Sequence, residues 1–380
     1  MKRLFCALMS FVLAFAAMLA LSCKATASEL RTTVYSKGMN GYSTFRIPAI
    51  VRTNDNTLLA FAEARRDGVG DAGNIDLVVR RSVDGGASWS DIIVVWNDAE
   101  NTCGNPAPVV DRATGRVVLL MTWNRGEDRE RAIMRRQSKD TRRVFICHSE
   151  DDGLSWSKPR EITSTTKHDD WAWYATGPCH ALQLQHKPFR GRLVVPCVHS
   201  LYENGKTYYN AHLIYSDDGG TSWSIGATLK GGNESTIAER ADGSIMHNSR
   251  WQRGAMKYAR HYAISCDGGV TSGEVVRDAV LIEPVCQGTI IGYSPAGRAT
   301  NHLLFCNPAS TKRRERLTLR QSHDGGLTWR DGLLIEEGAS AYSDMVILKR
   351  KQIGVIFECG EKSPYERIDF RVVKRLPRHL

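Results

Sequence analysis

Short apolar or alternating runs recur along the chain, and a turn-like segment rich in glycine and aspartate follows each of the clearest ones. These runs occupy residues 75–81, 144–148, 212–215 and 317–321. A short apolar or period-two run bounded by turn residues is typical of a β-strand. No apolar period of 3.6 residues persists after residue 27. The pattern therefore predicts an all-β protein.

One eight-residue pattern, Ser-x-Asp-x-Gly-x-x-Trp, directly follows each of these runs. The intact copies span 82–89, 149–156, 216–223 and 322–329, and a fifth at 265–272 has Ser272 in place of the tryptophan. The aspartate can accept hydrogen bonds from the amides that follow it, and the glycine can adopt the positive φ of a tight turn. We expect each octet to be a hairpin turn whose tryptophan folds back against its own strands.

The repetition of strand and turn predicts radial architecture. Such units, repeated every 40–50 residues or more, are typical of a β-propeller. Division of residues 28–380 into units of that size suggests about six blades, with seven left open. The Asp-Gly-Gly centres of the octets resemble calcium loops but lack the later bidentate glutamate, so we interpret the octets as structural turns.

The first residues have the composition of an export signal. Lys2 and Arg3 precede an uncharged apolar run that ends at Leu21, and an Ala-Thr-Ala sequence then matches the small-residue pattern of a signal-peptidase site. We therefore expect residues 1–27 to be a signal peptide and 28–380 to form a single domain.

Two other fates of this segment stay open. About 18 apolar residues can nearly span a bilayer, so the run could remain as an uncleaved anchor. Alternatively, Ala20-Leu21-Ser22-Cys23 loosely matches a bacterial lipoprotein signal, with Ala20 where leucine is usual. In that case the signal would end before Cys23, and Cys23 would carry the lipid.

Composition and charge narrow the class of protein. Hydrophobic residues make up 42% and charged residues 24%, a balance that excludes a disordered chain, a coiled coil or a polytopic membrane protein. The net charge of +10 is spread along the chain without a nucleic-acid-binding motif, so we expect no nucleic-acid partner. The basic balance favours an anionic partner of another kind.

The cysteines predict neither zinc sites nor a dense disulfide framework. Eight of the ten follow the leader, an even number that permits disulfides in an exported protein. Their wide spacing contains no Cys-x-x-Cys pair, which argues against zinc. Because Cys147 and Cys306 lie inside apolar runs, we expect mainly buried, reduced thiols.

An ordered set of motifs carries a family resemblance. Phe45-Arg46-Ile47-Pro48 precedes the first octet. Further motifs follow in order: Phe61-Ala62-Glu63-Ala64-Arg65, Asn233-Glu234-Ser235, His247-Asn248-Ser249-Arg250 and Ala341-Tyr342-Ser343-Asp344. The set resembles the sialidase (exo-α-neuraminidase) superfamily over about Thr32 to Phe370. The resemblance implies a six-bladed propeller with its site at the centre.

The resemblance implies three arginines for the carboxylate of a sialic acid. They correspond to Arg46, Arg250 and one of Arg313, Arg314 and Arg316, of which Arg314 has the best spacing. A guanidinium suits this task because its planar fork binds a carboxylate through two hydrogen bonds and stays charged. The apolar residues around Arg46 support its role, since an unpaired charge there would be costly.

The resemblance also implies the catalytic groups. Tyr342 corresponds to the nucleophile and Glu234 to its base; a neutral phenol avoids repulsion by the substrate carboxylate, and sialidases are known for a tyrosine nucleophile. The general acid should lie in the glycine-rich loop after Arg65, where spacing favours Asp71 over Asp67. Arg65 corresponds to an additional arginine near the carboxylate or the acid. The aromatics within 171–178 could line the pocket or pack in the core.

These residues predict hydrolysis of terminal α-linked sialic acid from glycoproteins, glycolipids or oligosaccharides, with retention and a tyrosyl-enzyme intermediate, and without cofactor or metal. Two alternatives stay open: a sialoglycan-binding propeller without catalysis, and a trans-sialidase or anhydro-forming variant. We expect an exported monomer, periplasmic, secreted or on the cell surface, that contacts a membrane only if it is lipidated or anchored.

Overall fold

The structure is a computed structural model that describes residues 30–254, 257–294, 299–374 and 376. The predicted signal peptide at 1–27, including Cys23, lies outside these residues. Within them, no helix combines the length and hydrophobicity needed to cross a membrane.

Strands dominate the fold, as predicted, and form four almost entirely antiparallel sheets. The first sheet contains β2 (Thr44–Arg52), β3 (Leu58–Arg65), β4 (Ile75–Ser82), β5 (Ile93–Trp96), β6 (Thr102–Val110), β7 (Val117–Asn124), β8 (Arg143–Ser149) and β9 (Arg160–Glu161). The second contains β10 (Trp171–Thr176), β11 (Leu182–Gln183), β12 (Leu193–Glu203), β13 (Lys206–Ser216) and β14 (Ser224–Lys230).

The third sheet consists of β15 (Ser235–Glu239), β16 (Ile245–Ser249), β17 (Ala259–Ser265) and β18 (Val276–Ile282). The fourth consists of β1 (Arg31–Ser36), β19 (Thr289–Gly292), β20 (Leu303–Pro308), β21 (Glu315–Ser322), β22 (Leu333–Ile347), β23 (Ile353–Gly360) and β24 (Arg367–Val373). Helical segments in the described chain are short: α2 (Glu130–Met134), α3 (Thr163–Thr166) and the 3₁₀ turns Met39–Gly41 and Lys349–Lys351. The all-β prediction is therefore confirmed.

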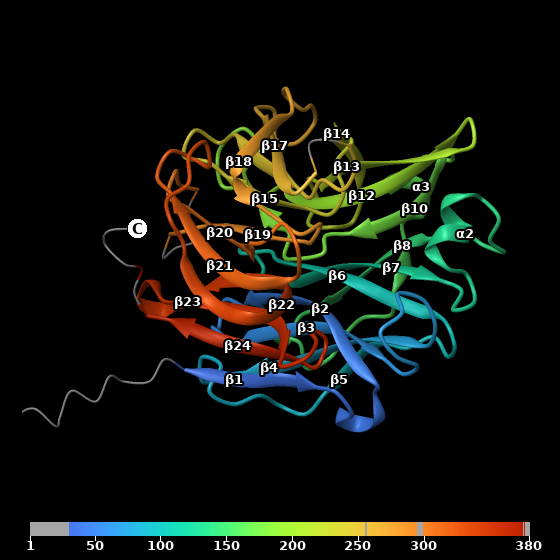
Figure 1. The fold of residues 1–380 in the computed structure, drawn as a ribbon, viewed down its shortest axis with the longest axis horizontal. Helices are drawn as coiled ribbons and strands as arrows, with labels where there is room; N and C mark the ends of the chain where they lie inside the picture. The colour runs from blue at the N-terminus through green and yellow to red at the C-terminus, as the bar shows by residue number, and fades with distance from the viewer. Residues whose placement is uncertain (1–29, 255–256, 295–298, 375, 377–380) are drawn as a thin grey trace, which may run out of the picture.

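The sheets are arranged around a ring of strands, which we call the inner ring: β2, β6, β11, β15, β19 and β22. Each strand of the ring contacts the next, and β22 returns to contact β2. In Figure 1 the chain accordingly passes around the molecule, from blue through green and yellow to red. β10 continues the line of β11, because both pair with β12.

A buried carboxylate joins strands at the middle of the ring. Asp344 of β22 is fully buried. Its side chain accepts hydrogen bonds from the backbone N–H groups of Ile50 and His180, each at 2.9 Å, and from Thr289 Oγ1 at 2.9 Å. Its Oδ1 also lies 2.6 Å from Nδ1 of His180. Asp344 therefore connects three strands of the inner ring and satisfies buried donors that would otherwise be costly.

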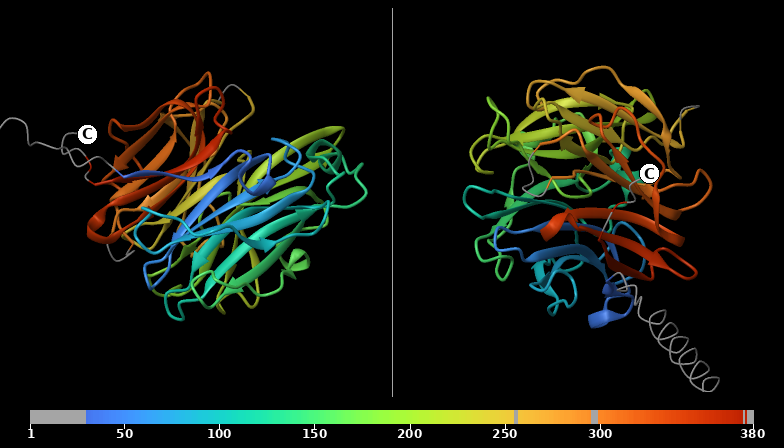
Figure 2. Two further views of the ribbon diagram at one scale, coloured as in Figure 1. Left: turned by 90° about the horizontal axis from the view of Figure 1, so that it is seen from below. Right: turned by 90° about the vertical axis from the view of Figure 1, so that its left-hand side faces the viewer.

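The first and last strands of the fold meet in one sheet. β1 pairs with β24, next to β23. Arg31 Nε donates to Asp369 Oδ2 at 2.8 Å across this pairing, although the two residues are 338 positions apart. In Figure 2 the blue N-terminal strand accordingly lies against the red C-terminal strands. The circle of sheets is thus closed by hydrogen bonds between the first and last described strands.

The five octets are the turns that the sequence predicts. Each connects two neighbouring strands of one sheet. In the first, Ser82 Oγ accepts from Gly86 N at 2.8 Å and donates to Asp84 Oδ1 at 2.8 Å, and Asp84 Oδ1 accepts from Ser88 N at 3.0 Å. The other four repeat this serine–aspartate–glycine arrangement. Gly86 has φ of 92°, a conformation that glycine adopts without strain.

The octet tryptophans pack differently from the prediction. Trp89 contacts Phe370 of another sheet, with ring centroids 5.4 Å apart, and Trp156 contacts Phe61 of the distant strand β3 at 5.6 Å. The expectation that each tryptophan folds against its own strands is wrong for these two. In both cases the turn lies beside the preceding unit of the ring, and its indole packs there.

The thiol prediction is largely confirmed. All eight cysteines after the leader are free, and seven are buried: Cys103, Cys147, Cys179, Cys197, Cys286, Cys306 and Cys359. Cys266 is exposed, since it occupies the second position of the fifth octet, where the side chain faces solvent.

Candidate active site

A distorted strand directs the first predicted arginine toward the centre of the ring. The pairing of β2 with β3 shifts register between Arg46 and Ala49, which marks a β-bulge. Between them, Ile47 has φ of 58°, a strained conformation for a β-branched residue. Its N–H donates to Glu358 Oε1 at 2.9 Å, a bond that holds the strained backbone in place.

Glu358 of β23 also fixes the Arg46 side chain. Arg46 Nε donates to Glu358 Oε1 at 3.1 Å, while Glu358 Oε2 accepts from the backbone N–H of Tyr342 at 3.2 Å. Glu358 is fully buried, and Arg46 is 5% exposed. The ion pair offsets the cost of burying the Arg46 charge. One carboxylate thus positions both Arg46 and the backbone of Tyr342.

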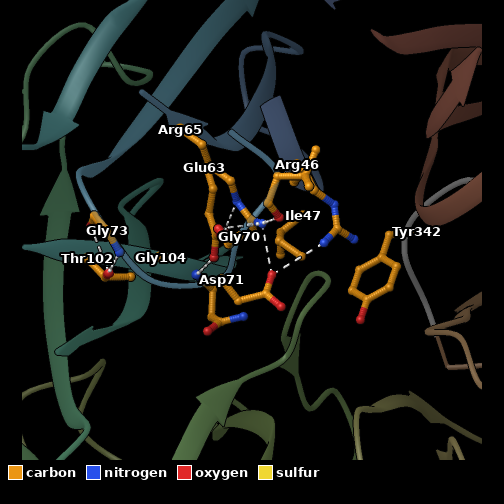
Figure 3. Close-up of polar contacts among 12 residues, drawn as sticks. Arg46, Ile47, Glu63, Arg65, Gly70, Asp71, Gly73, Thr102, Gly104 and Tyr342 are labelled. Carbon is orange, nitrogen blue, oxygen red and sulfur yellow. Dashed lines mark hydrogen bonds and ion pairs between the residues drawn. The ribbon is translucent and has the colours of Figure 1, made fainter. Parts of the chain in front are cut away.

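Asp71 faces two arginines across the mouth of the site (Figure 3). Its Oδ1 lies 2.8 Å from Arg65 Nη1 and 3.4 Å from Arg46 Nη1. Burial acts to raise the pKa of Asp71, but Arg65 and Arg46 hold it below its usual range. The side chain remains 59% exposed, so a ligand can reach it. Asp67, the alternative acid, instead contacts the N–H of Asn74 and does not line the cavity.

Arg65 is held by a second buried acid. Its guanidinium forms an ion pair with Glu63 of the same strand at 2.5 Å. Arg65 Nη1 also donates to the carbonyl of Gly70 at 3.0 Å, in the loop that carries Asp71. Of the two groups expected near Arg65, the structure shows contact with Asp71, the predicted acid. Glu63 and Arg65 together determine where this loop lies.

Tyr342 and Glu234 form a direct hydrogen bond. Tyr342 Oη donates to Glu234 Oε1 at 2.5 Å. Arg250 Nη1 donates to Tyr342 Oη at 3.1 Å and also to Glu234 Oε2. Burial raises the pKa of the Tyr342 phenol well above its ordinary value, Glu234 raises it further, and Arg250 and Arg314 oppose both effects. Without a ligand, the phenol is therefore a protonated donor to Glu234.

Arg314 completes the group of arginines. Its Nη1 donates to Tyr365 Oη at 2.9 Å, and its Nη2 donates to the carbonyl of Val285 at 3.1 Å. Its guanidinium carbon lies 5.3 Å from the centre of the Tyr342 ring. The neighbouring Arg313 and Arg316 are exposed and do not line the cavity. Among the three candidates, the structure thus places Arg314 at the site.

All seven predicted residues line one cavity of about 440 Å³, which we call the central cavity. They are Arg46, Arg65, Asp71, Glu234, Arg250, Arg314 and Tyr342. A volume of this size is typical of a small-molecule site. Within the described residues, no cluster of three or more His, Cys, Asp or Glu side chains could hold a metal ion. The chemistry available here is that of arginines, carboxylates and the phenols of Tyr209, Tyr342 and Tyr365.

Further residues of the wall were not predicted. Arg142 is fully buried, stacks 4.0 Å from the Trp173 ring, and donates to Asn124 Oδ1 at 2.9 Å. Burial lowers its pKa to about 10. Trp173 lines the cavity, whereas Trp171 stacks on His199 at 3.5 Å and packs in the core. Of the aromatics within 171–178, Trp173 therefore lines the pocket and Trp171 packs in the core.

Comparison with known proteins agrees with this geometry. A family model described as "BNR repeat-like domain" matches residues 56–355. The chain is 31% identical over 353 residues to an "Exo-alpha-sialidase" of Arthroderma benhamiae, covering 85% of this chain and 81% of that protein. This chain belongs to the sialidase family.

Other sialidases differ more in length. The chain is 31% identical to a "Sialidase" of Micromonospora viridifaciens over 85% of its own residues, but spans only about half (51%) of that relative. Among solved structures, "Hadza microbial sialidase Hz136" superposes with a TM-score of 0.80 at 28% identity, over 91% of this chain and 68% of that one. The family match thus includes nearly all of the described fold.

Proposed function

We propose that this sialidase-family protein is a retaining exo-α-sialidase that hydrolyses terminal α-linked sialic acid from glycoproteins, glycolipids or oligosaccharides. The observation that carries the proposal is the 2.5 Å hydrogen bond between Tyr342 and Glu234 beside the arginines of the central cavity. We further propose that the four sheets correspond to six blades, one for each strand of the inner ring. The ring of contacts and the repeated octets support this division.

The first step is recognition of the substrate carboxylate by Arg46, Arg250 and Arg314. Guanidinium groups bind a carboxylate through paired, charge-assisted hydrogen bonds. Arg46 is positioned for this by Glu358, and Arg250 by Glu234 and by Gln252, which accepts from Arg250 Nη2 at 2.9 Å. These contacts fix the guanidinium groups before the ligand arrives, which reduces the cost of ordering them on binding.

Attack by Tyr342 follows. Glu234 accepts the phenolic proton while Tyr342 Oη forms a bond to the anomeric carbon and the bond from that carbon to the leaving oxygen breaks. The raised pKa of Tyr342 means that the phenol needs this base at neutral pH. Arg250, which donates to Tyr342 Oη, stabilises the negative charge that develops on it.

Asp71 supplies the proton to the leaving oxygen, and this role requires a change in its surroundings. In the ligand-free site its pKa is lowered by Arg65 and Arg46. A substrate carboxylate that engages Arg46 competes for one of these partners and adds a negative charge nearby, so binding raises the pKa of Asp71. On substrate binding, Asp71 thereby takes up a proton from solvent and becomes a competent acid.

The second half of the reaction hydrolyses the tyrosyl-enzyme intermediate and returns the enzyme to its starting state. Asp71, now ionised, removes a proton from a water molecule that attacks the anomeric carbon and displaces Tyr342 Oη, which recovers its proton from Glu234. Each displacement inverts the anomeric carbon, so the product retains the α configuration.

The experiment is incubation of the protein with a fluorogenic α-sialoside, with the sugar product followed by NMR. Initial release of α-sialic acid supports the proposal. An anhydro sugar or a transferred product would instead indicate one of the variants, and binding without release would indicate a sialoglycan-binding propeller.

We also propose that the protein is exported as a monomeric catalytic domain after removal of residues 1–27, on the sequence pattern of that segment. N-terminal sequencing of the mature protein and mass analysis for a lipid on Cys23 test this. Light scattering tests the oligomeric state.

A further inference from the structure

A second hollow adjoins the central cavity, and we call it the basic groove. It has a volume of about 310 Å³. Its lining consists of Glu130, Arg131, Met134, Arg135, Thr207, Tyr209, Gln252 and Arg253. Glu130, Tyr209 and Gln252 also line the central cavity. The two hollows therefore share a wall, and a group that leaves the central cavity past these residues enters the groove.

Three arginines give the groove its positive charge. Arg131, Arg135 and Arg253 are all exposed. Within the described residues, none of them has a carboxylate within ion-pair distance; Arg253 donates only to the backbone oxygen and Oγ1 of Thr207. In contrast, two of the three arginines that touch substrate in the proposed function, Arg46 and Arg250, each contact an acid of the protein. The groove thus presents cations that no ion pair among the described residues neutralises.

The one acid of the groove, Glu130, is hydrogen-bonded to another residue of its lining. Glu130 Oε1 accepts a hydrogen bond from Tyr209 Oη at 2.6 Å. Burial raises the pKa of this carboxyl above its ordinary value. Three arginines against one acid leave the groove with a net positive charge. A concave surface of one sign attracts ligands of the opposite sign.

We propose that the basic groove binds a second anionic group of the substrate, so that the enzyme favours sialosides with two negative charges. The inference rests on the proposed sialidase function, since the first anion is the carboxylate held by Arg46, Arg250 and Arg314. Two sources supply the same chemistry: a second sialic acid residue in the aglycone, or a sulfate ester on the glycerol arm of the terminal sugar. Each of these groups lies on the terminal sugar in the central cavity or on the sugar next to it.

The test compares three substrates: a monosialoside with a neutral aglycone, its counterpart with a sulfate ester on the glycerol arm, and an α2,8-linked disialoside. The variant is R131Q/R135Q/R253Q, which removes the groove cations, none of which lines the central cavity. The matched control is R129Q, because Arg129 is an exposed arginine of the same segment that does not line the groove.

We expect the triple variant to lower kcat/KM about five- to ten-fold on a doubly charged substrate, because exposed ion pairs contribute modestly and add up. The loss on the neutral-aglycone monosialoside should be under two-fold, and R129Q should change all three substrates equally. A selective loss on the disialoside identifies the second sugar as the source, and a selective loss on the sulfated substrate identifies the glycerol arm. Added salt should reduce the wild-type preference for the affected substrate.

Equal changes on all three substrates would overturn the groove assignment while the sialidase function stands. If the wild-type protein releases sugar from none of them, the proposed function itself fails and the groove inference with it. Should the triple variant fail to fold by circular dichroism, the single variants R131Q, R135Q and R253Q serve instead. Each is then expected to give about a two-fold selective loss.

Discussion

The two ends of the inner ring differ although the same strands build both. Toward the central cavity, backbone strain and charge are concentrated: Ile47, Asn105 and Val285 have positive φ, and Arg46 and Tyr342 project inward. At the other end, a smaller hollow of about 250 Å³ is lined largely by regular strand residues with apolar side chains. These include Ile50, Val109, Ile237, Ile291 and Ile347. His180, which contacts the buried Asp344, also lines this hollow.

This difference indicates that the cavity end serves turnover and the opposite end serves stability. β-Bulges and strained residues redirect side chains, and they persist only where surrounding structure holds them. The regular apolar strand residues at the opposite end supply the surrounding packing that holds the strained residues in place. We therefore expect substitutions at the cavity end to reduce turnover with little effect on stability, and substitutions at the opposite end to do the reverse.

The largest effect is expected for Tyr342→Phe. The change removes one oxygen and preserves the ring, so the melting temperature should stay near that of the parent, while kcat falls by about 10³-fold or more because the nucleophile is lost. Steady-state kinetics and calorimetry measure the two quantities. Near-normal turnover by a folded variant would make Tyr342 a packing residue.

Glu234→Gln gives a related loss of about 10²–10⁴-fold, the usual contribution of a general base. Because the pair acts as a unit, the double variant should be little worse than the more damaged single variant. A 3-fluorinated sialosyl fluoride should let the covalent intermediate accumulate, and peptide mapping should locate the sugar on Tyr342. Label on Glu234 or Asp71 would contradict the mechanism.

Ile347→Ala tests the opposite end. Ile347 is 7% exposed, and its truncation should lower the free energy of unfolding by about 2–4 kcal/mol through lost packing. At 25 °C the kcat/KM of the folded fraction should remain that of the parent. The exposed Val276 is the control, since Val276→Ala should cost less than about 0.5 kcal/mol in urea unfolding. A loss of turnover without a loss of stability would break the proposed division.

Arg46→Lys should have a smaller effect. The charge is kept, but an ammonium cannot reproduce the two-pronged contact with the substrate carboxylate. The expected loss in kcat/KM is about 10- to 100-fold, from a charge-assisted hydrogen bond of roughly 1.5–3 kcal/mol. Comparable kinetics for the parent and a folded variant would remove Arg46 from the site.

The smallest effect concerns the pH dependence of stability at the opposite end. Burial acts to lower the pKa of His180, but the adjacent Asp344 raises it above its ordinary value. The stability that protonated His180 gains from Asp344 is therefore fully present below about pH 6.5, the pKa of an unfolded histidine. It is lost as pH rises through the higher pKa of the folded state.

His180→Gln is the variant for this test. The difference in unfolding free energy between parent and variant, measured in urea, should be larger at pH 6 than at pH 9. A difference that is constant or grows with pH would show that the His180–Asp344 contact is not an ion pair.

Much of the site could be predicted from sequence because its residues lie in contiguous motifs. Arg46, Glu234, Arg250 and Tyr342 each sit within such a motif, and the octets locate the turns between strands. For Asp71 and Arg314, spacing favoured one residue among neighbours, and the cavity lining agrees with those choices.

The supporting residues were harder to find. Glu358 is a single acid in an otherwise apolar strand, a signal that it needs a buried partner, but that partner, Arg46, comes from another strand. Glu63 has its partner Arg65 two residues further along the same strand. Arg142 has no such signal, because it is one arginine among many and its burial arises only when Trp173 packs over it. The positions of Trp89 and Trp156 were missed for the same reason, since Phe370 and Phe61 come from other units.

The pairing of β1 with β24 has a consequence for how this protein is made on the ribosome. β1 is synthesised first among the described strands and β24 last. β1 therefore has no partner strand to pair with until nearly all of the described chain has been translated. Until residues 367–373 emerge, β1 and β23 each expose an unpaired edge, which can pair with other chains. In a nascent chain that stops before Arg367, the circle of sheets therefore stays unclosed. We expect chaperones that cover strand edges to bind such intermediates.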